Sequence, residues 1–185
     1  MGVFSMLDLA GIDVNFLVRD SNRASIAHDE SYCRLGDELY AMGRYGQKTG
    51  RGFYLYEGRN RKDDAEVIAL AEHLADELEI PQRSMDDQEI LDRCLFVLIN
   101  EGIQLLDEGI ALRAGDIDLV WINGYGFPAH LGGPMHYTEQ LGLSNVLVGL
   151  QRYRQALGEY GEMWFQPAPL LERLVAAGRK RIERF

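Results

Sequence analysis

The stretch DIDLVWINGYGFPAHLGGPM, residues 116–135, packs glycines, prolines and aromatic residues into one short segment. Gly124-x-Gly126-x-x-Ala129 within it matches the fingerprint of a dinucleotide-binding turn, which places a pyrophosphate at the N-terminus of the next helix. The strand-like residues 119–122 suit that motif, but Pro128 and the glycines and proline at 132–134 interrupt any following helix. We therefore predict a structural turn here and assign it no cofactor-binding residue.

A fainter copy of this region occurs at the start of the chain, at a constant offset of 131 residues. The aligned positions are Gly2, Phe4, Asp8, Gly11 and Ile12 with Gly133, Met135, Glu139, Gly142 and Leu143. This echo predicts a duplicated unit. Only Met1 precedes the first copy, so we expect that copy to be truncated, to expose core surface, and to belong to a fragment of a longer protein.

Apolar residues at helical spacing predict helices over residues 63–79, 86–106, 135–141, 144–157 and 169–177. Ser84-x-x-Asp87 has the form of a capping box before the longest of these, whose apolar residues on more than one side indicate a central helix. Residues 53–56 form the only persuasive extended segment. We predict an all-α fold with three parts: a partial first repeat at 1–60, a connecting helix and linker at 61–84, and a complete second repeat at 85–185.

The composition excludes several classes of protein. A formal net charge of -10 argues against a nucleic-acid surface, and no apolar run approaches the roughly 20 residues that span a bilayer. The N-terminus lacks the features of a signal peptide, so we expect a cytoplasmic location. Cys33 and Cys94 lie far apart and are expected to be packing residues, and the histidine spacing predicts no metal site.

Two further segments hold candidate polar groups. The loop GRYGQKTGRG, residues 43–52, resembles a phosphate loop, but Gln47 breaks the required spacing. We interpret it as a turn that leads into the extended segment, with Lys48 as the residue that could meet an anionic ligand. In the long helix, Glu101 is either a general acid or base, or a buried carboxylate bonded to a neighbouring helix end.

Several motifs in a fixed order then indicate a family. They are residues 2–14, the loop and aromatic strand at 43–56, residues 90–95, the Asn-Glu-Gly at 100–102, residues 108–109, 116–128 and 132–135. The chain resembles the C-terminal part of the 3-hydroxyacyl-CoA dehydrogenases, most closely those of the peroxisomal bifunctional type. The resemblance implies two tandem copies of a helical domain like the 6-phosphogluconate dehydrogenase C-terminal domain. Val3 departs from the proline usual in this family, which Pro134 keeps in the second copy.

The resemblance also implies a function in fatty acid β-oxidation, the NAD-dependent oxidation of a 3-hydroxyacyl-CoA to a 3-ketoacyl-CoA. NAD would bind an upstream domain that this chain lacks, and no catalytic residue carries over. The helical part is expected to shape the acyl-CoA cleft, support a homodimer and be inactive alone. Asn123, Tyr125 and Lys48 are the substrate-binding candidates. The alternatives are a dimerisation or docking module without catalytic activity and an acyl-CoA binding protein.

Overall fold

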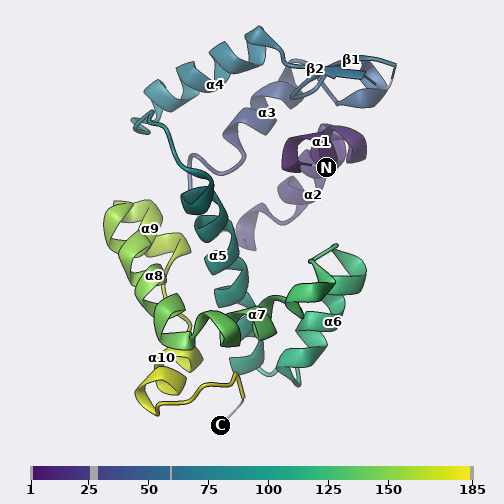
Figure 1. The fold of residues 1–185 in the computed structure, drawn as a ribbon. Coiled ribbons are helices and arrows are strands. Elements are labelled where there is room, and N and C mark those ends of the chain that lie inside the picture. The colour runs from purple at the N-terminus through teal and green to yellow at the C-terminus, as the bar shows by residue number, and fades with distance from the viewer. Residues whose placement is uncertain (1, 26–28, 59, 184–185) are drawn as a thin grey trace. The chain divides into compact units, whose positions relative to one another are not determined.

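The computed structural model describes residues 2–25, 29–58 and 60–183. The chain forms two compact units, Met1–Ser84 and Met85–Phe185, termed here the N-unit and the C-unit. Nearly all regular structure in the described residues is helical, which confirms the predicted all-α fold (Figure 1).

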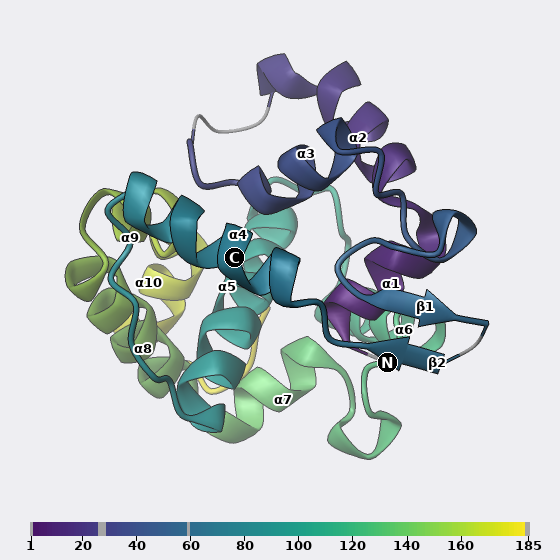
Figure 2. The same ribbon diagram turned by 90° about the horizontal axis from the view of Figure 1, so that it is seen from above.

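The described residues of the N-unit form four α-helices and one small hairpin. The helices are α1 Val3–Ala10, α2 Ile12–Ser21, α3 Arg34–Ala41 and α4 Ala65–Glu77, with 3₁₀ turns at Arg23–Ser25 and Gln47–Thr49. The strands β1 Leu55–Glu57 and β2 Asn60–Lys62 pair antiparallel (Figure 2), so the extended segment predicted at 53–56 begins later than expected. The buried apolar core of this unit is small and consists of Ile12, Leu39, Phe53 and Val67.

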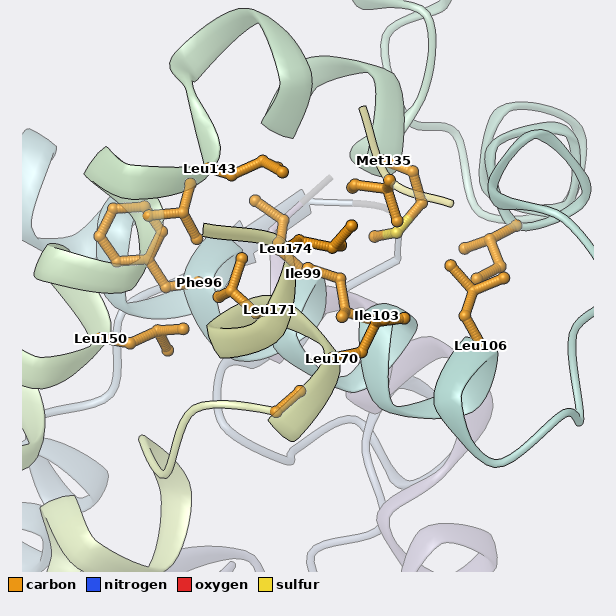
Figure 3. Packing of buried hydrophobic residues seen from close by; sticks show 14 of the residues in the cluster. Phe96, Ile99, Ile103, Leu106, Met135, Leu143, Leu150, Leu170, Leu171 and Leu174 are labelled. Atoms are coloured by element: carbon orange, nitrogen blue, oxygen red, sulfur yellow. The ribbon is translucent and has the colours of Figure 1, made fainter. Parts of the chain in front are cut away.

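In the C-unit, residues 85–183 form six α-helices. They are α5 Asp87–Asp107, α6 Ala114–Gly124, α7 Pro134–Leu141, α8 Leu143–Ala156, α9 Gly158–Trp164 and α10 Pro169–Ala176, with a 3₁₀ turn at Ala129–Leu131. Figure 3 shows side chains of α5 packed against those of α7, α8 and α10. α5 contributes the fully buried Ile99 and Ile103 to this large core and is its central helix, as predicted.

The two units repeat the same pair of helices. α7 begins and ends 131 residues after α1 begins and ends. α8 begins 131 residues after α2 begins. Gly11 and Gly142 each join the two helices at positive φ, 105° and 89°. Their amides donate to the oxygens of Leu7 at 2.8 Å and Thr138 at 2.9 Å. The predicted duplication is therefore confirmed.

A third helix belongs to the repeat. α10 begins and ends 135 residues after α3 begins and ends. The two helices are followed by turns of the same kind. The amides of Arg44 and Arg179 donate to Leu39 and Leu174, each at 2.9 Å.

Several local predictions need correction. Residues 119–122, predicted to be strand-like, lie inside α6, because packing against α7 overrides their β-branched character. The Ser84 capping box is wrong: Asp86 caps α5, with its carboxylate accepting from the Glu89 amide at 2.7 Å. The helices α1, α2, α3 and α9 were not anticipated, because short helices with mixed patterns carry little periodic signal.

Two cysteines expected to be buried, and one glutamate for which burial was one of two interpretations, are exposed. Cys33 and Cys94 are both exposed, so neither is a packing residue as predicted. Glu101 is exposed on α5, which removes the interpretation as a buried carboxylate. Its neighbour Asn100 instead makes the structural contact: its amide donates to Gln166 O and its oxygen accepts from the Ala168 amide, both at 2.8 Å.

Candidate functional site

The glycine-rich loop of the N-unit is organised around one buried carboxylate. Asp8 is 1% exposed and accepts from the amides of Phe53 at 2.9 Å and Tyr54 at 3.1 Å, and from the Tyr56 hydroxyl at 2.8 Å. A Cβ at Gly52 would lie 2.0 Å from an Asp8 carboxylate oxygen, so the loop requires glycine there. Sequence reasoning did not assign this role to Asp8, but the interpretation of the loop as a structural turn is confirmed.

The Asp8 carboxylate also affects the tyrosine that binds it. Burial, together with the hydrogen bond and the negative charge of Asp8, raises the pKa of Tyr56 to about 12. The hydroxyl therefore stays protonated and donates throughout the physiological range.

Lys48 lies at the tip of this loop and is engaged within its own unit. Its ammonium Nζ is 2.5 Å and 2.6 Å from the two carboxylate oxygens of Asp13, in the first turn of α2. The hydrogen bond from Lys48 lowers the pKa of Asp13. The Lys48 side chain is 49% exposed, so an anionic ligand would meet a lysine whose charge Asp13 already partly neutralises.

Asn123 and Tyr125 lie together at the C-terminal end of α6. The Asn123 side-chain amide donates to Leu119 O at 2.8 Å, one turn back on its own helix. Tyr125 is 70% exposed, and its ring contacts that of Trp121 with centroids 4.9 Å apart. The two predicted contacts therefore share one exposed helix end, whereas Lys48 belongs to the other unit.

An open groove of about 570 Å³ lies between α6 and α7, next to this helix end. Its lining includes Leu119 and Ile122 as apolar side chains and Asp118 as a buried carboxylate, but neither Asn123 nor Tyr125. Asp118 accepts from the Met135 amide at 2.7 Å and so caps α7. Burial raises the pKa of Asp118. Sequence reasoning missed the role of Asp118. The available signal in the sequence is an acidic residue that precedes the Gly133-Pro134 start of a helix.

The backbone around Gly124 does not fit a dinucleotide. Gly124 ends a helix rather than following a strand, and the next element, Ala129–Leu131, is a three-residue 3₁₀ turn. A pyrophosphate site needs the N-terminus of a full helix at that point. These residues therefore do not bind NAD in the manner of the motif they imitate.

The histidines that the structure describes lie on the surface. His73, His130 and His136 are all exposed, and the His136 ring lies 2.9 Å from the Gln140 side-chain nitrogen. His28 lies outside the described residues. Among the residues that the structure describes, no group of three or more His, Cys, Asp or Glu side chains could hold a metal ion. No described helix is long and apolar enough to cross a membrane.

The comparisons with known proteins agree with this architecture. The family model for the 3-hydroxyacyl-CoA dehydrogenase C-terminal domain matches residues 1–56 and 90–184, one segment in each unit. The chain belongs to this family. The two matched segments contain the two copies of the repeated helices described above.

Individual relatives cover the chain almost completely. It is 40% identical to a peroxisomal bifunctional enzyme of Danio rerio over 100% of its length and 36% identical to the Homo sapiens counterpart over 96%. The dehydrogenase part of multifunctional enzyme 1 from C. elegans is 26% identical with a TM-score of 0.69, covering 94% of this chain and 38% of that one. The 3-hydroxybutyryl-CoA dehydrogenase of Escherichia coli shares the fold, with a TM-score of 0.67 at 21% identity over 96% of this chain and 52% of that one.

The match is to one part of these longer proteins. The chain spans 27% of the Danio rerio protein and 26% of the Homo sapiens protein. Both shares are far below the full length of the bifunctional enzyme. The family assignment therefore applies to the helical C-terminal region.

Proposed function

We propose that this chain is the helical part of an NAD-dependent 3-hydroxyacyl-CoA dehydrogenase of fatty acid β-oxidation, inactive alone, that shapes the acyl-CoA cleft. The observation that supports this most is the family match in two segments, which follows the internal repeat. NAD would bind a separate α/β domain, since the residues around Gly124 do not fit a dinucleotide. The reaction removes a hydride and a proton from the 3-hydroxyl carbon and oxygen, and those steps would use residues of that domain.

We further propose the division into a partial first repeat at 1–60, a connecting segment at 61–84 and a second repeat at 85–185. Residues 61–84 contain α4 and carry no part of the repeated helices. A homodimer is also proposed, and light scattering of the chain would test it. The similarity to peroxisomal enzymes favours a peroxisomal over a cytoplasmic location, and imaging of a fluorescent fusion would distinguish the two.

Asn123, Tyr125 and Lys48 are proposed to contact the acyl-CoA. Tyr125 supports this most directly, because a 70%-exposed aromatic ring resting on Trp121 offers a surface on which an adenine or acyl group could stack. Lys48 would bind a phosphate of CoA after exchanging its contact with Asp13.

Enzyme assays test the central proposal. The chain alone with NAD and a 3-hydroxyacyl-CoA should form no NADH, measured by absorbance. Mixing it with the NAD-binding domain of a 3-hydroxyacyl-CoA dehydrogenase that lacks its helical part should restore NADH formation. NADH formation by the chain alone would disprove inactivity, and a silent mixture would count against the enzyme function.

Calorimetry with acyl-CoA tests the site residues. Tyr125→Ala should weaken binding, whereas Tyr160→Ala, which changes a tyrosine beside Trp164 on α9, should not. Lys48→Met has a matched control in Lys62→Met, since Lys62 is also exposed and paired, with Glu57 at 2.8 Å. Equal losses in a variant and its control would remove that residue from the site.

The acyl-CoA binding protein is the second candidate. Strong binding of long-chain acyl-CoA together with a silent mixture would favour it. The observation that supports this candidate is the open apolar groove between α6 and α7.

A further inference from the structure

A small, partly enclosed cavity of about 140 Å³ lies where α5, α7 and α8 of the C-unit meet. It has roughly the volume of four or five molecules of liquid water, so it suits a small molecule and not a cofactor. Its apolar lining consists of Leu95, Phe96, Leu141 and Val146. Its polar lining consists of Gln88, Asp92, Tyr137 and Asn145.

The polar side of this cavity is rich in hydrogen-bond acceptors. The side-chain nitrogen of Gln88 donates to Asp92 Oδ1 at 2.6 Å, and that of Asn145 donates to Leu141 O at 2.7 Å. Each amide therefore leaves its carbonyl oxygen for a ligand. The Asp92 carboxylate adds further acceptor positions, since an ionised carboxylate has about four. A ligand rich in donors matches this side.

Asp92 also gives the cavity a negative charge. Among the described residues that line the cavity there is no lysine, arginine or histidine. Arg152 reaches Asp92 from outside this lining, with its Nη2 3.5 Å from Oδ2, and its side chain is 61% exposed. A pair this long and this exposed neutralises the carboxylate only in part. The cavity therefore attracts a cation and repels an anion.

The apolar side of the cavity distinguishes an organic cation from a metal ion. Calcium and magnesium need about six or more oxygen ligands, whereas Phe96 and Val146, which are 9% and 0% exposed, offer a dry hydrocarbon surface. An aromatic ring is also a favourable neighbour for an organic cation. An ammonium group on a short alkyl chain satisfies both sides, because it has three donors, one positive charge and an apolar tail.

We propose that this cavity binds a small primary alkylammonium, a free amine with a chain of about four carbons. Its ammonium donates to Asp92 and to the side-chain oxygens of Gln88 and Asn145, and its alkyl chain lies against Phe96 and Val146. A free amine is favoured over a lysine of a partner protein, because a partner would have to bring its surface against the exposed guanidinium of Arg152. The inference rests on the cavity and not on the proposed enzyme function.

An NMR titration of the full chain with n-butylammonium chloride tests the inference. Chemical-shift changes should concentrate at the backbone amides of Asp92, Tyr137 and Asn145. The Kd should be on the order of 1 mM, as expected for about five heavy atoms. 1-Butanol has nearly the same shape without the charge, so it should bind at least about tenfold more weakly.

A charge-removing substitution tests the role of Asp92. Asp92→Asn keeps the shape of the side chain and should weaken binding of n-butylammonium at least about tenfold. Asp107→Asn is the matched control on the same helix: the side chain of Asp107 is 23% exposed, against 22% for Asp92, and it pairs with Arg173 at 2.5 Å. This control should leave the Kd unchanged. If either variant folds poorly, the comparison of n-butylammonium with 1-butanol on the unchanged chain still decides.

Three results would overturn the inference. Absence of shifts at the cavity residues would leave the cavity to water alone. Equal binding of n-butylammonium and 1-butanol, or equal Kd values in D92N and D107N, would remove the charge recognition. Tighter binding of N-acetyl-lysine methylamide than of n-butylammonium would assign the cavity to the lysine of a partner protein. A silent NADH assay changes none of these readouts, so the two proposals fail separately.

Discussion

The N-unit and the C-unit build the same three-helix motif with very different amounts of core. Leu39 and Leu174 occupy equivalent positions, and both are fully buried. Around Leu174 lies a large cluster that includes side chains of α5, whereas Leu39 shares its cluster with three other buried side chains among the described residues. The difference shows that the repeated helices supply the shape of the motif, while α5 adds Phe96, Ile99, Ile103 and Leu106 to the larger core.

The largest expected effect tests this difference directly. Leu174→Ala should cost about 2–5 kcal/mol, and Leu39→Ala should fall at the lower end, because a smaller core relaxes more easily around a cavity. Trp121 and Trp164, the two tryptophans of the chain, both lie in the C-unit, so their fluorescence in urea reports on that unit alone. Leu174→Ala should lower the midpoint of the tryptophan transition. An equal shift from Leu39→Ala would mean that the two units unfold together.

Equivalent acidic residues give the second test. Asp8 accepts three hydrogen bonds, while its counterpart Glu139 accepts one from the Ile182 amide at 2.8 Å. Asp8→Ala should cost about 3 kcal/mol and Glu139→Ala about 1 kcal/mol, because the first leaves more buried donors without an acceptor. Hydrogen exchange at the Phe53 and Tyr54 amides should accelerate only in the first variant. Similar costs in urea would contradict this ranking.

Swapping side-chain sizes at equivalent helix positions gives the third test. Gly149→Val should cost about 1–3 kcal/mol, because any side chain there meets the Phe96 ring. Val18→Ala should change stability by less than about 0.5 kcal/mol, since Val18 is 58% exposed. Urea unfolding of both variants measures the difference. A large cost for Val18→Ala would show that Val18 is covered in solution.

The smallest effect concerns alkaline pH and separates the loop of the N-unit from the C-unit. The pKa of Tyr56 is raised from 10.0 to about 12 in the folded state. Its contribution to stability is therefore fully present below pH 10 and is lost as pH rises from 10 through 12. Urea unfolding of the N-unit, followed by circular dichroism, should show this loss of stability. Tyr56→Phe should abolish this dependence on pH. A similar decline in the tryptophan signal of the C-unit would point to other titrating groups.

Most described helices of the C-unit were predictable, whereas α4 was the one predicted helix among those described in the N-unit. Long periodic runs identified α4 and α5, because many side chains of each face a core. The helical character of residues 119–122 depends on α7 packing against α6, and this tertiary contact leaves no trace in a short apolar run. The role of Asp8 is likewise invisible in sequence, since its partners lie 45–48 residues away. Asn123, Tyr125 and Lys48 as substrate contacts remain predictions.

The buried guanidinium of Arg44 sets a limit on how the chain can be shortened. Arg44 is 1% exposed and donates to Gly52 O at 3.1 Å, to Glu66 at 2.9 Å and to Asp64, which caps α4. A truncation that ended after the β-hairpin would leave this charge inside without its carboxylates, at a cost of about 3–5 kcal/mol. The smallest autonomous form of the N-unit must therefore extend into the first turn of α4.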